Sequence, residues 1–512
     1  VGMSVHAPIL AIAVPLLGGF AAPLLARIHR KVRDLWVLLV VFFSGACVGY
    51  VAAHVLSSGI WVYVLGARNP QETLAPGGFP IRIMLTVDAM SAFMGLIAGF
   101  LALVAFPFAL KYIPEEEGKT LALTLSLLLL AGILGLAYTG DLFNFFVFLE
   151  VTSIAACGII GFRTWISRAP EAAFKTMVLF SLSGLFFLLA SAFLYGEYGA
   201  LNLAYLSAQI KGTLVDKLAL ALFLAGLIMK VAAAPVHFWA PDAYGEAPAA
   251  KTLLLVVNTQ VSLYGLWRVL FTLYGGALSA GVGWLVTSLG LLTMVVAAFM
   301  ALVQVDLGRL VAYGAVSQIG YMMLGVGVGL VTLAGRPDYG FVAMKGGIFH
   351  MLNDALTVGL LFLCVGAVEW TKGTRDLREL GGLGHGLPGV ALCFLLASLA
   401  LAGIPPLNGF ASKILIYEGS FRLSPILAAV AVLASILLLA VFARAFHGAF
   451  LGPRAEVKEG LPWVFLLSMG ALAVGILVLG LVPGFFVEEL VAPAAKALWH
   501  GRALYLAAVL GG

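Results

Sequence analysis

The chain has 512 residues, of which 62% are hydrophobic and only 10% are charged, and its formal net charge is +5. Soluble proteins carry about 25% charged and about 45–50% apolar residues, so this composition excludes an ordinary soluble domain and indicates a polytopic membrane protein. The 60 glycines agree with that class, because small residues let membrane helices approach closely. The basic residues fall mostly in short loops, which favours a role in topology over nucleic-acid binding.

Apolar segments long enough to cross a membrane recur fourteen times, since one crossing needs about 20 apolar residues. We therefore expect an all-α fold with both ends of the chain on the same side of the membrane. The expected helices, numbered 1 to 14, span residues 7–26, 34–58, 82–110, 120–139, 142–162, 172–195, 216–240, 248–274, 280–303, 308–332, 341–368, 387–417, 424–450 and 461–486. The first segment lacks a basic region and a cleavage site, so we expect it to be retained.

The loop charges predict an orientation. Basic clusters follow helices 1, 5, 11 and 13, and these helices are all odd-numbered, so the clusters lie on one side. By the positive-inside rule that side is the cytoplasm, which puts both termini on the outer face of a prokaryotic plasma membrane. The residues are Arg27, Arg30, Lys31 and Arg33, then Arg163 and Arg168, then Lys372, Arg375 and Arg378, then Arg454 and Lys458.

Two charged residues lie deep inside apolar runs. Glu150 is in the run 142–152, and Lys230 is in the run 218–234. A charge at mid-membrane costs at least about 2.5 kcal/mol on insertion scales, so such residues usually face a hydrated interior and transfer ions or protons. We expect the two to form an ion pair near the bilayer centre or to be joined through one water. Lys175 is a second possible partner for Glu150.

Two of the expected helices are interrupted by proline. Helix 7 contains Pro235, followed by His237, and helix 12 contains Pro405 and Pro406, followed by Lys413. Proline removes a backbone hydrogen bond, and carbonyls freed inside a membrane need polar neighbours or water. Two interrupted helices, five apart, indicate inverted repeats made of helices 4–8 and 9–13. The expected units are residues 1–119, 120–275, 276–450 and 451–512.

Other polar residues in the apolar runs have two interpretations. Lys251, near the start of helix 8, either takes part in ion transfer or extends to the cytoplasmic surface. His350 and Asp354 share one face of helix 11, so they form either a packing pair or a proton relay. The relay is chemically reasonable because histidine titrates near neutral pH.

Residues 230–248 resemble the most specific motif of the antiporter-like subunits shared by Mrp cation/proton antiporters, respiratory complex I and membrane-bound hydrogenases. The resemblance covers nearly the whole chain in order. It implies that Glu150, Lys230, His350 and Lys413 match the family's charged residues on helices 5, 7, 11 and 12, which form a hydrated axis. Supporting stretches are residues 87–91, 141–150, 306–313, 317–321, 349–353 and 403–413.

The sequence departs from this family at two places. Gln260 stands where the family usually has a lysine on helix 8, and Asp354 and Val358 stand in a helix 11 motif that often has histidine and lysine. Glutamine can orient water but cannot hold a charge. Either Lys251 and Asp354 replace the missing lysines, or the central relay is altered. The chain lacks the long lateral helix of the largest complex I member, which favours a shorter Mrp-type subunit.

The leading hypothesis is therefore an ion-translocating subunit, for H⁺ and/or Na⁺, of a multisubunit Mrp antiporter or a respiratory-type complex such as a hydrogenase, sulfur reductase or NADH dehydrogenase-like complex. Expected partners are other membrane subunits, including further antiporter-like ones, a peripheral redox module in a redox-driven complex, and the lipid bilayer, but no nucleic acid. We expect no cofactor, because no Cys-x-x-Cys pair exists for a cluster or zinc. The alternatives are a stand-alone transporter of a small solute and a structural subunit with a degenerated ion path. The four isolated cysteines are Cys47, Cys157, Cys364 and Cys393.

Overall fold

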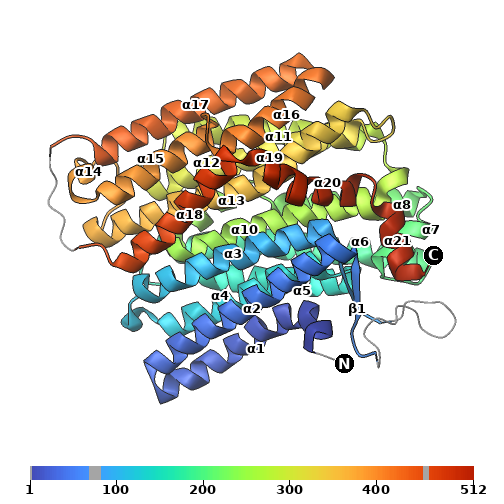
Figure 1. Cartoon of the computed structure of the whole chain (residues 1–512), viewed down its shortest axis with the longest axis horizontal. Coiled ribbons are helices and arrows are strands. Elements are labelled where there is room, and N and C mark those ends of the chain that lie inside the picture. Colours follow the sequence, from blue (N-terminus) through green and yellow to red (C-terminus); the bar gives the residue numbers. More distant parts are fainter. Residues whose placement is uncertain (1–2, 68–81, 454–459, 512) are drawn as a thin grey trace.

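The computed structural model describes residues 3–67, 82–453 and 460–511. It is a bundle of long helices that lie side by side (Figure 1), and twelve helices of the described part are long and apolar enough to cross a membrane. The predicted all-helical membrane class is confirmed, apart from one small two-stranded sheet. Of the basic loop residues, Arg454 and Lys458 lie outside the described residues.

The N-terminal part contains three long helices and the sheet. Strands β1 and β2 pair antiparallel, with Trp61 opposite Val87. The prediction of a helix over 82–110 was wrong at its start, because residues 84–87 form β2 and Asp88 caps the following helix by accepting from the backbone N of Ser91 at 3.0 Å. A short apolar run cannot be assigned to helix or strand by periodicity alone. The elements are η1 Met3–His6, α1 Ala7–Ile28, α2 Arg30–Ser58, β1 Trp61–Val64, β2 Met84–Val87, α3 Ala89–Tyr112 and η2 Glu115–Glu117.

The next part contains the first interrupted helix. The helix that ends at Lys230 resumes only at Trp239, and Pro235 and His237 lie in the gap. Two hydrogen bonds fasten the gap: Trp239 Nε1 donates to the carbonyl oxygen of Met229 at 2.9 Å, and the backbone N of Ala234 donates to a threonine hydroxyl of α11 at 2.9 Å. The elements are α4 Lys119–Tyr138, α5 Leu142–Ile160, α6 Arg168–Tyr198, α7 Leu203–Gln209, α8 Leu214–Lys230, α9 Trp239–Glu246, α10 Ala249–Trp267, the π-helix η3 Arg268–Tyr274 and η4 Gly275–Ala277.

The following part contains the second interruption. Pro405 and Pro406 lie between α15 and α16, and the N-terminus of α16 is joined to α13 by reciprocal hydrogen bonds between Asn353 and Asn408. Each side-chain amide donates to the other residue's backbone carbonyl, at 2.8 and 3.2 Å. The elements are α11 Ala280–Leu302, α12 Leu307–Val331, α13 Asp338–Lys372, α14 Leu383–Gly386, α15 Pro388–Ala402, α16 Asn408–Leu423 and α17 Pro425–Phe450.

The C-terminal part is longer than predicted. The expected helix 461–486 ends at Leu481, because Pro483 cannot continue it, and the chain then turns into further helices that reach Leu510. The end of α18 lies against the gap between α15 and α16, where a Cβ at Gly480 would overlap the backbone of residues 406–408. The elements are α18 Trp463–Leu481, α19 Pro483–Phe486, the π-helix η5 Val487–Val491, α20 Ala492–Trp499 and α21 Arg502–Leu510.

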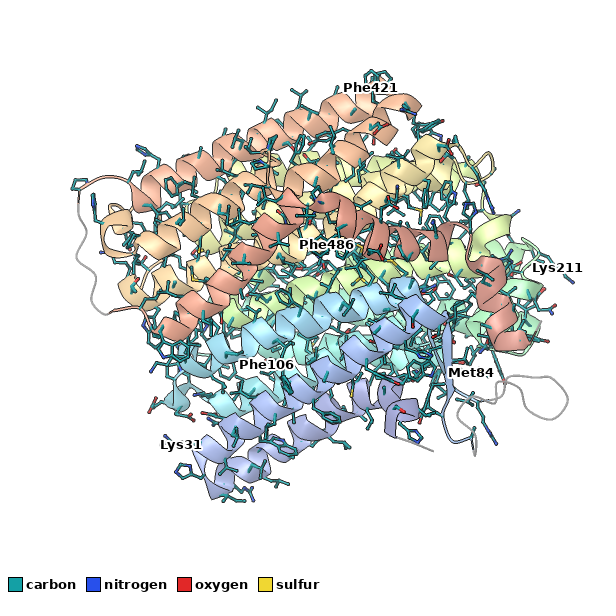
Figure 2. The ribbon with its side chains drawn as sticks, in the orientation of Figure 1. Lys31, Met84, Phe106, Lys211, Phe421 and Phe486 are labelled. Atoms are coloured by element: carbon teal, nitrogen blue, oxygen red, sulfur yellow. The ribbon has the colours of Figure 1, made fainter. Side chains whose placement is uncertain are left out.

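The bundle has two distinct ends. Side chains fill the spaces between the helices, and Lys31 and Lys211 lie at opposite ends (Figure 2). The connection between α1 and α2 and the short helix α14 share one end, whereas α7 and α21 lie at the other (Figure 1). We call the first end the basic end, because the predicted basic loops lie there.

Candidate functional site

Lys230 is completely buried at the C-terminus of α8 and binds three groups of α5. Its Nζ donates to the carbonyl oxygen of Leu149 at 2.7 Å and to the hydroxyls of Thr152 and Ser153 at 3.0 and 2.7 Å. The ring of Phe180 lies 4.8 Å from the same nitrogen. An ammonium group has three N–H donors, so these three oxygens satisfy all of them.

The direct form of the ion pair expected between Glu150 and Lys230 is not formed, and the form joined through one water stays a prediction. The two charges are near enough to interact electrostatically, but no ion pair joins them among the described residues. Glu150 Oε1 has no hydrogen-bond partner and lies against Gly184 of α6, where a Cβ would overlap it. Lys175 does not pair with Glu150 either, because its Nζ binds Asp242 at 3.0 Å and Glu171 at 2.6 Å.

Glu150 lines a cavity of about 470 Å³ between α5 and α6. Ser153, which binds Lys230, lines it as well, so the cavity reaches the surroundings of that lysine. Its rim carries Ile154, Phe174 and Met177, whose side chains are exposed on the outside of the bundle. The carboxyl group therefore faces a lateral opening and not a closed ion pair.

Lys413 is also buried, and it lies on α16 just after the second interruption. Its Nζ donates to the carbonyl oxygen of Leu401 at 2.7 Å and to Ser435 Oγ at 2.9 Å, and it lies 4.1 Å from the ring centre of Tyr321. Leu401 is in the last turn of α15, where carbonyls have no partner within the helix. The lysine thus satisfies a carbonyl that the interruption sets free.

A hydrogen bond between two side chains joins the middle of α10 to α13. Gln260 Nε2 donates to Asp354 Oδ2 at 3.0 Å, and both residues are buried. The second oxygen of each side chain, Gln260 Oε1 and Asp354 Oδ1, has no partner among the described residues. Such orphaned buried oxygens are costly and mark places where water or an ion is favoured.

His350 does not pair with Asp354, although the two share one helix. Its Nδ1 lies 2.8 Å from Ser412 Oγ, and its Nε2 lies 3.1 Å from Gln318 Oε1. No hydrogen bond joins His350 to Asp354 among the described residues, and the packing pair and the proton relay both stay predictions. His350 of α13 instead contacts Gln318 of α12 and Ser412 of α16. Ser412 directly precedes Lys413 in the chain.

Lys251 does not extend to the surface. It is only 1% exposed, its Nζ has no hydrogen-bond partner among the described residues, and the ring of Phe162 lies 5.8 Å away. The surface interpretation failed because every residue of α10 is buried, including Lys251 in its first turn. His237 is half-buried, and its Nδ1 also lacks a partner. Pro235, Pro405 and Pro406 are exposed, so both interruptions reach the outside of the bundle.

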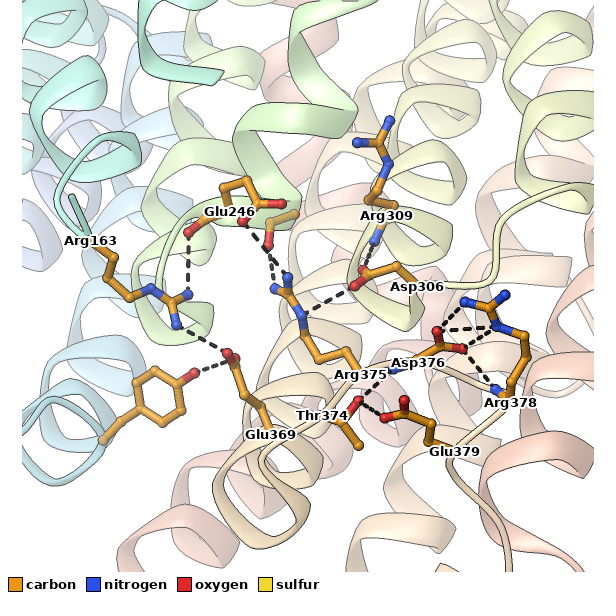
Figure 3. A network of polar contacts seen from close by, with 12 residues as sticks. Arg163, Glu246, Asp306, Arg309, Glu369, Thr374, Arg375, Asp376, Arg378 and Glu379 are labelled. Atoms are coloured by element: carbon orange, nitrogen blue, oxygen red, sulfur yellow. Dashed lines mark hydrogen bonds and ion pairs between the residues drawn. The ribbon is translucent and has the colours of Figure 1, made fainter. Parts of the chain in front are cut away.

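A network of ion pairs surrounds α9 at the basic end (Figure 3). Asp242 of α9 binds Lys175 at 3.0 Å and Arg309 at 2.7 Å, and these residues line a polar cavity of about 450 Å³. Arg163 binds Glu369 of α13 at 3.0 Å and donates to the carbonyl oxygen of Glu246 at 3.2 Å. Further contacts join Arg375 to Asp306 at 3.4 Å, to Glu246 at 3.9 Å and to the carbonyl oxygen of Gly245. The second half of the first interrupted helix is therefore held by charges on its neighbours.

Sequence reasoning missed the polar side chains that position the two lysines. Thr152 and Ser153 follow Glu150 directly, and hydroxyl groups beside a charge in an apolar run are a usable signal. Gln318 and Tyr321 stand in a stretch that resembles the family but does not by itself indicate a role. Ser435 sits in a featureless apolar run, and nothing in the sequence distinguishes it. In the described part of the chain, no cluster of three or more His, Cys, Asp or Glu residues could hold a metal.

Comparison with known proteins identifies the family. The family model described as NADH:quinone oxidoreductase/Mrp antiporter, TM, matches residues 139–438. The chain is 34% identical to NADH-quinone oxidoreductase subunit N of Desulforudis audaxviator, over 94% of this chain and 96% of that protein. It is 32% identical to a Na(+)/H(+) antiporter subunit of Alkalihalophilus pseudofirmus, over 88% of each chain.

A solved structure gives the same result. A chain of the Mrp complex from Dietzia sp. superposes with a TM-score of 0.86 and 27% identity, over 100% of both chains. The matched region includes both interruptions, Glu150, Lys230, Gln260, Asp354 and Lys413. The chain is a multi-pass membrane protein of the antiporter-like kind, and it belongs to the NADH:quinone oxidoreductase/Mrp antiporter family.

Proposed function

We propose that this protein is an ion-translocating subunit, for H⁺ and/or Na⁺, of a multisubunit Mrp antiporter or respiratory-type complex. The observation that carries the proposal is the environment of Lys230 and Lys413. Both are buried beside an interrupted helix, and both bind a backbone carbonyl and hydroxyl groups, with no carboxylate partner among the described residues. A structural ammonium in a membrane is normally neutralised by an acid, whereas a transfer site must accept and release its charge.

The proposed path joins the two lysines through the centre of the bundle. From Lys230 it runs through Gln260 and Asp354, which are bonded to each other, and then through His350 and Ser412 to Lys413. Histidine and serine are both donor and acceptor, so protons can pass along them, while the amide of Gln260 orients its neighbours without holding a charge. The orphaned oxygens of Gln260 and Asp354 are where we expect water or a cation in the path.

Glu150 and Lys251 are the proposed peripheral sites of this path. Glu150 faces the lateral cavity between α5 and α6, so we infer that it exchanges ions with a neighbouring membrane subunit. Lys251 lies in the first turn of α10, which begins three residues after the end of α9. We propose that Lys251 and His237 receive ions from the basic end. Opening the ion pairs of Asp242 would loosen α9 and give access to the interruption.

We infer fourteen crossings built as two inverted repeats. The twelve long apolar helices omit both interrupted ones, and counting α8 with α9 and α15 with α16 as one crossing each brings the total to fourteen. Helices 4–8, within residues 120–275, and helices 9–13, within 276–450, form the repeats. Residues 1–119 and 451–512 flank them. In this arrangement each repeat contributes one interrupted helix with a buried lysine beside the interruption.

The proposed orientation places the basic end in the cytoplasm, by the positive-inside rule. The termini then face the outside of a prokaryotic plasma membrane. The partners we propose are further membrane subunits, as the Mrp complex and the NADH-quinone oxidoreductase of the relatives suggest by name. The driving force would come from those partners or from a peripheral redox module.

Transport of a small solute by the chain alone is the competing proposal. The cavity beside Glu150 is the observation that favours it, but its walls are mostly apolar, with Cys157, Phe174 and Met177 among them. Such walls offer few groups to recognise a polar solute. The other alternative is a structural subunit with a degenerated ion path. Such a subunit would have no need of a buried lysine such as Lys230, whose three N–H donors are all satisfied.

The proposal is tested by ion flux in vesicles that contain the purified complex. Lys230→Ala should abolish coupled H⁺ or Na⁺ movement while the complex still assembles, because alanine is cheaper in lipid than lysine. The matched control is Lys217→Ala, which removes an exposed lysine from the same helix. Equal flux in the Lys230→Ala variant and the parent would assign the lysine a structural role and reject the proposal.

A further inference from the structure

A cavity of about 500 Å³ lies at the end of the bundle opposite the basic end. It is enclosed by η3, the beginning of α11, the end of α12 and the C-terminal helices α20 and α21. Most of its lining residues are apolar, and they include Phe271, Leu330, Leu498 and Leu506. Its rim is open, because residues such as Ala280 and Ala503 are exposed. The ion path proposed above does not use this cavity.

Three basic side chains line the cavity, and none of its lining residues is acidic. Arg336 Nη1 lies 3.0 Å from His500 Nδ1. Arg502 donates through Nε to Ser207 Oγ at 2.8 Å and through Nη2 to the backbone carbonyl of Ser207 at 2.6 Å. Neither guanidinium forms an ion pair with a carboxylate among the described residues. The exposed Arg336 and the half-buried Arg502 thus line one cavity, and neither has a carboxylate partner among the described residues.

The protonation of His500 is consistent with this arrangement. Partial burial and the positive charges of Arg336 and Lys496 lower the pKa of His500 below its usual value. The imidazole is therefore mostly neutral at pH 7 and can accept the hydrogen bond from Arg336. Lys496 adds a further positive charge close to the rim.

The backbone holds Arg336 in an unusual conformation. Its φ is +47°, in the left-handed region that side chains other than glycine rarely adopt. The backbone N of Arg336 donates to the carbonyl oxygen of Thr332 at 2.8 Å, and Pro337 follows, so the turn after α12 is fixed. This turn directs Arg336 to His500 and not away from the cavity. Such a conformation persists only when the surroundings enforce it, and it commonly accompanies a binding role.

We propose that this cavity binds the phosphate headgroup of an anionic phospholipid, with the start of an acyl chain against its apolar walls. The cavity lies where membrane-crossing helices end, at Val331 of α12, and begin, at Ala280 of α11. That is the depth at which phospholipid headgroups meet hydrocarbon. Guanidinium groups bind phosphate oxygens in a forked geometry, and basic pockets between membrane helices recognise anionic lipids.

A soluble phosphate compound has the same phosphate chemistry as a lipid headgroup, but it has no acyl chain to cover the apolar walls of the cavity. Leu278, Leu333 and Leu506 are only half-buried, and they would remain in contact with water if only a free anion were bound. The cavity volume also lies within the range of about 300–1,000 Å³ that is typical of sites for whole small molecules. The observations therefore favour the lipid as the source of the phosphate.

The test measures lipid binding to the full-length purified protein in uncharged detergent by native mass spectrometry. Phosphatidylglycerol should bind about tenfold more tightly than phosphatidylcholine, the factor that one charged contact of about 1.4 kcal/mol gives. Arg336→Gln should remove this preference. The matched control is Arg422→Gln, because Arg422 is also exposed but is paired with Glu418 at 2.9 Å.

Two further arms make the result decisive. Ala503→Trp fills the cavity from its exposed rim and should weaken phosphatidylglycerol binding even where folding is unchanged. Glycerol 3-phosphate, which lacks acyl chains, should not compete with the lipid. An unchanged preference in Arg336→Gln, an equal loss in Arg422→Gln, or full competition by glycerol 3-phosphate would overturn the proposal.

Discussion

Gln260 on α10 donates a hydrogen bond of 3.0 Å to Asp354 on α13, with both side chains buried in the middle of the bundle. Gln260 and Asp354 are two of the three positions at which the sequence departs from the motifs it resembles, and Val358 is the third. The first two departures therefore meet in space, and a lysine missing from one helix is accompanied by an acid gained on the other. We infer that the contact keeps a polar connection between the two parts of the molecule without a fixed positive charge on α10.

The hydroxyls of Thr152 and Ser153, which bind Lys230, should be needed for ion flux. Replacing Thr152 by Val and Ser153 by Ala removes two of its three acceptors. A hydrogen bond to a charged group contributes about 1.5–3 kcal/mol, and about 1.4 kcal/mol is a factor of ten. We expect ion flux to fall at least about tenfold in the double variant, measured in vesicles with the complex.

The control for that experiment is Ser191→Ala on α6. Ser191 is equally buried, but its hydroxyl bonds only to the carbonyl oxygen of Phe187 in its own helix. Its flux should equal that of the parent. A double variant that transports at the parent's rate would show that Lys230 is not a transfer site.

The ion pair of Glu115 should make stability depend on pH. Arg33 holds both carboxylate oxygens, at 3.0 and 2.6 Å, and Lys119 lies 3.2 Å away, so the Arg33 hydrogen bonds and then the contact with Lys119 lower the pKa of Glu115 from 4.5 to about 2. A lowered folded-state pKa stabilises the protein above 4.5, and that stabilisation is lost as the pH falls toward 2.

The melting temperature of the purified protein measures this effect. We expect Glu115→Gln to melt lower than the parent near neutral pH, and the difference to shrink as the pH falls from 4.5 toward about 2, where the parent loses its advantage. The neighbouring Glu116 is exposed, so Glu116→Gln should follow the parent at every pH. A constant difference between Glu115→Gln and the parent would contradict the assignment.

The sequence predicted the long apolar helices well because each one needs a long apolar run, and such runs are visible without knowing what they contact. It located both interruptions because proline marks them. The prediction of helix boundaries failed where an apolar run has neither the 3.6-residue period of a helix nor the two-residue period of a strand. Residues 84–87 form a strand, and the C-terminal helices continue to Leu510 beyond the bend at Pro483. Those outcomes depend on packing against α3 and α13, which the local sequence does not encode.

The candidate site was predicted residue by residue, but not its pairing. The cost of burying a charge identified Glu150 and Lys230, yet that cost does not say which atoms satisfy the charge. The structure pairs Lys230 with a carbonyl and two hydroxyls, and it turns Glu150 toward α6. The same holds for Lys251. Its position near the start of a helix allowed an extension to the surface, but the surrounding helices bury its side chain.

Labelling of single cysteines tests the proposed orientation. Arg30, Arg168 and Arg378 are exposed at the basic end, and their Cys variants, in a background without the four native cysteines, should react only with reagents that enter the cell. The reason is the positive-inside rule. Arg422→Cys is the control and should react from outside. Reaction of any of the first three with an impermeant reagent in intact cells would reverse the topology.

A lysine restored to α10 should be tolerated at the central contact. In Gln260→Lys the new ammonium would lie beside Asp354 and form an ion pair in place of the present hydrogen bond. We expect ion flux to stay at the parent's level or rise, because the charge gains a partner already in place. A variant that assembles but transports nothing would show that the site requires a neutral side chain.

If a single path joins Lys230 to Lys413 through Gln260 and Asp354, the Gln260→Leu variant should interrupt it. Leucine at position 260 removes the donor to Asp354 and excludes water from the middle of the path. A second variant, Gln318→Leu, removes the contact with His350 and blocks the path nearer to Lys413. Flux of H⁺ and Na⁺ is measured in vesicles that contain the parent or the Gln260→Leu complex in equal amounts. We expect flux in Gln260→Leu to fall at least about tenfold, as the loss of a buried hydrogen bond to an acid implies. Flux equal to that of the parent would show that ions do not cross between the two lysines, and the proposed path would then be wrong.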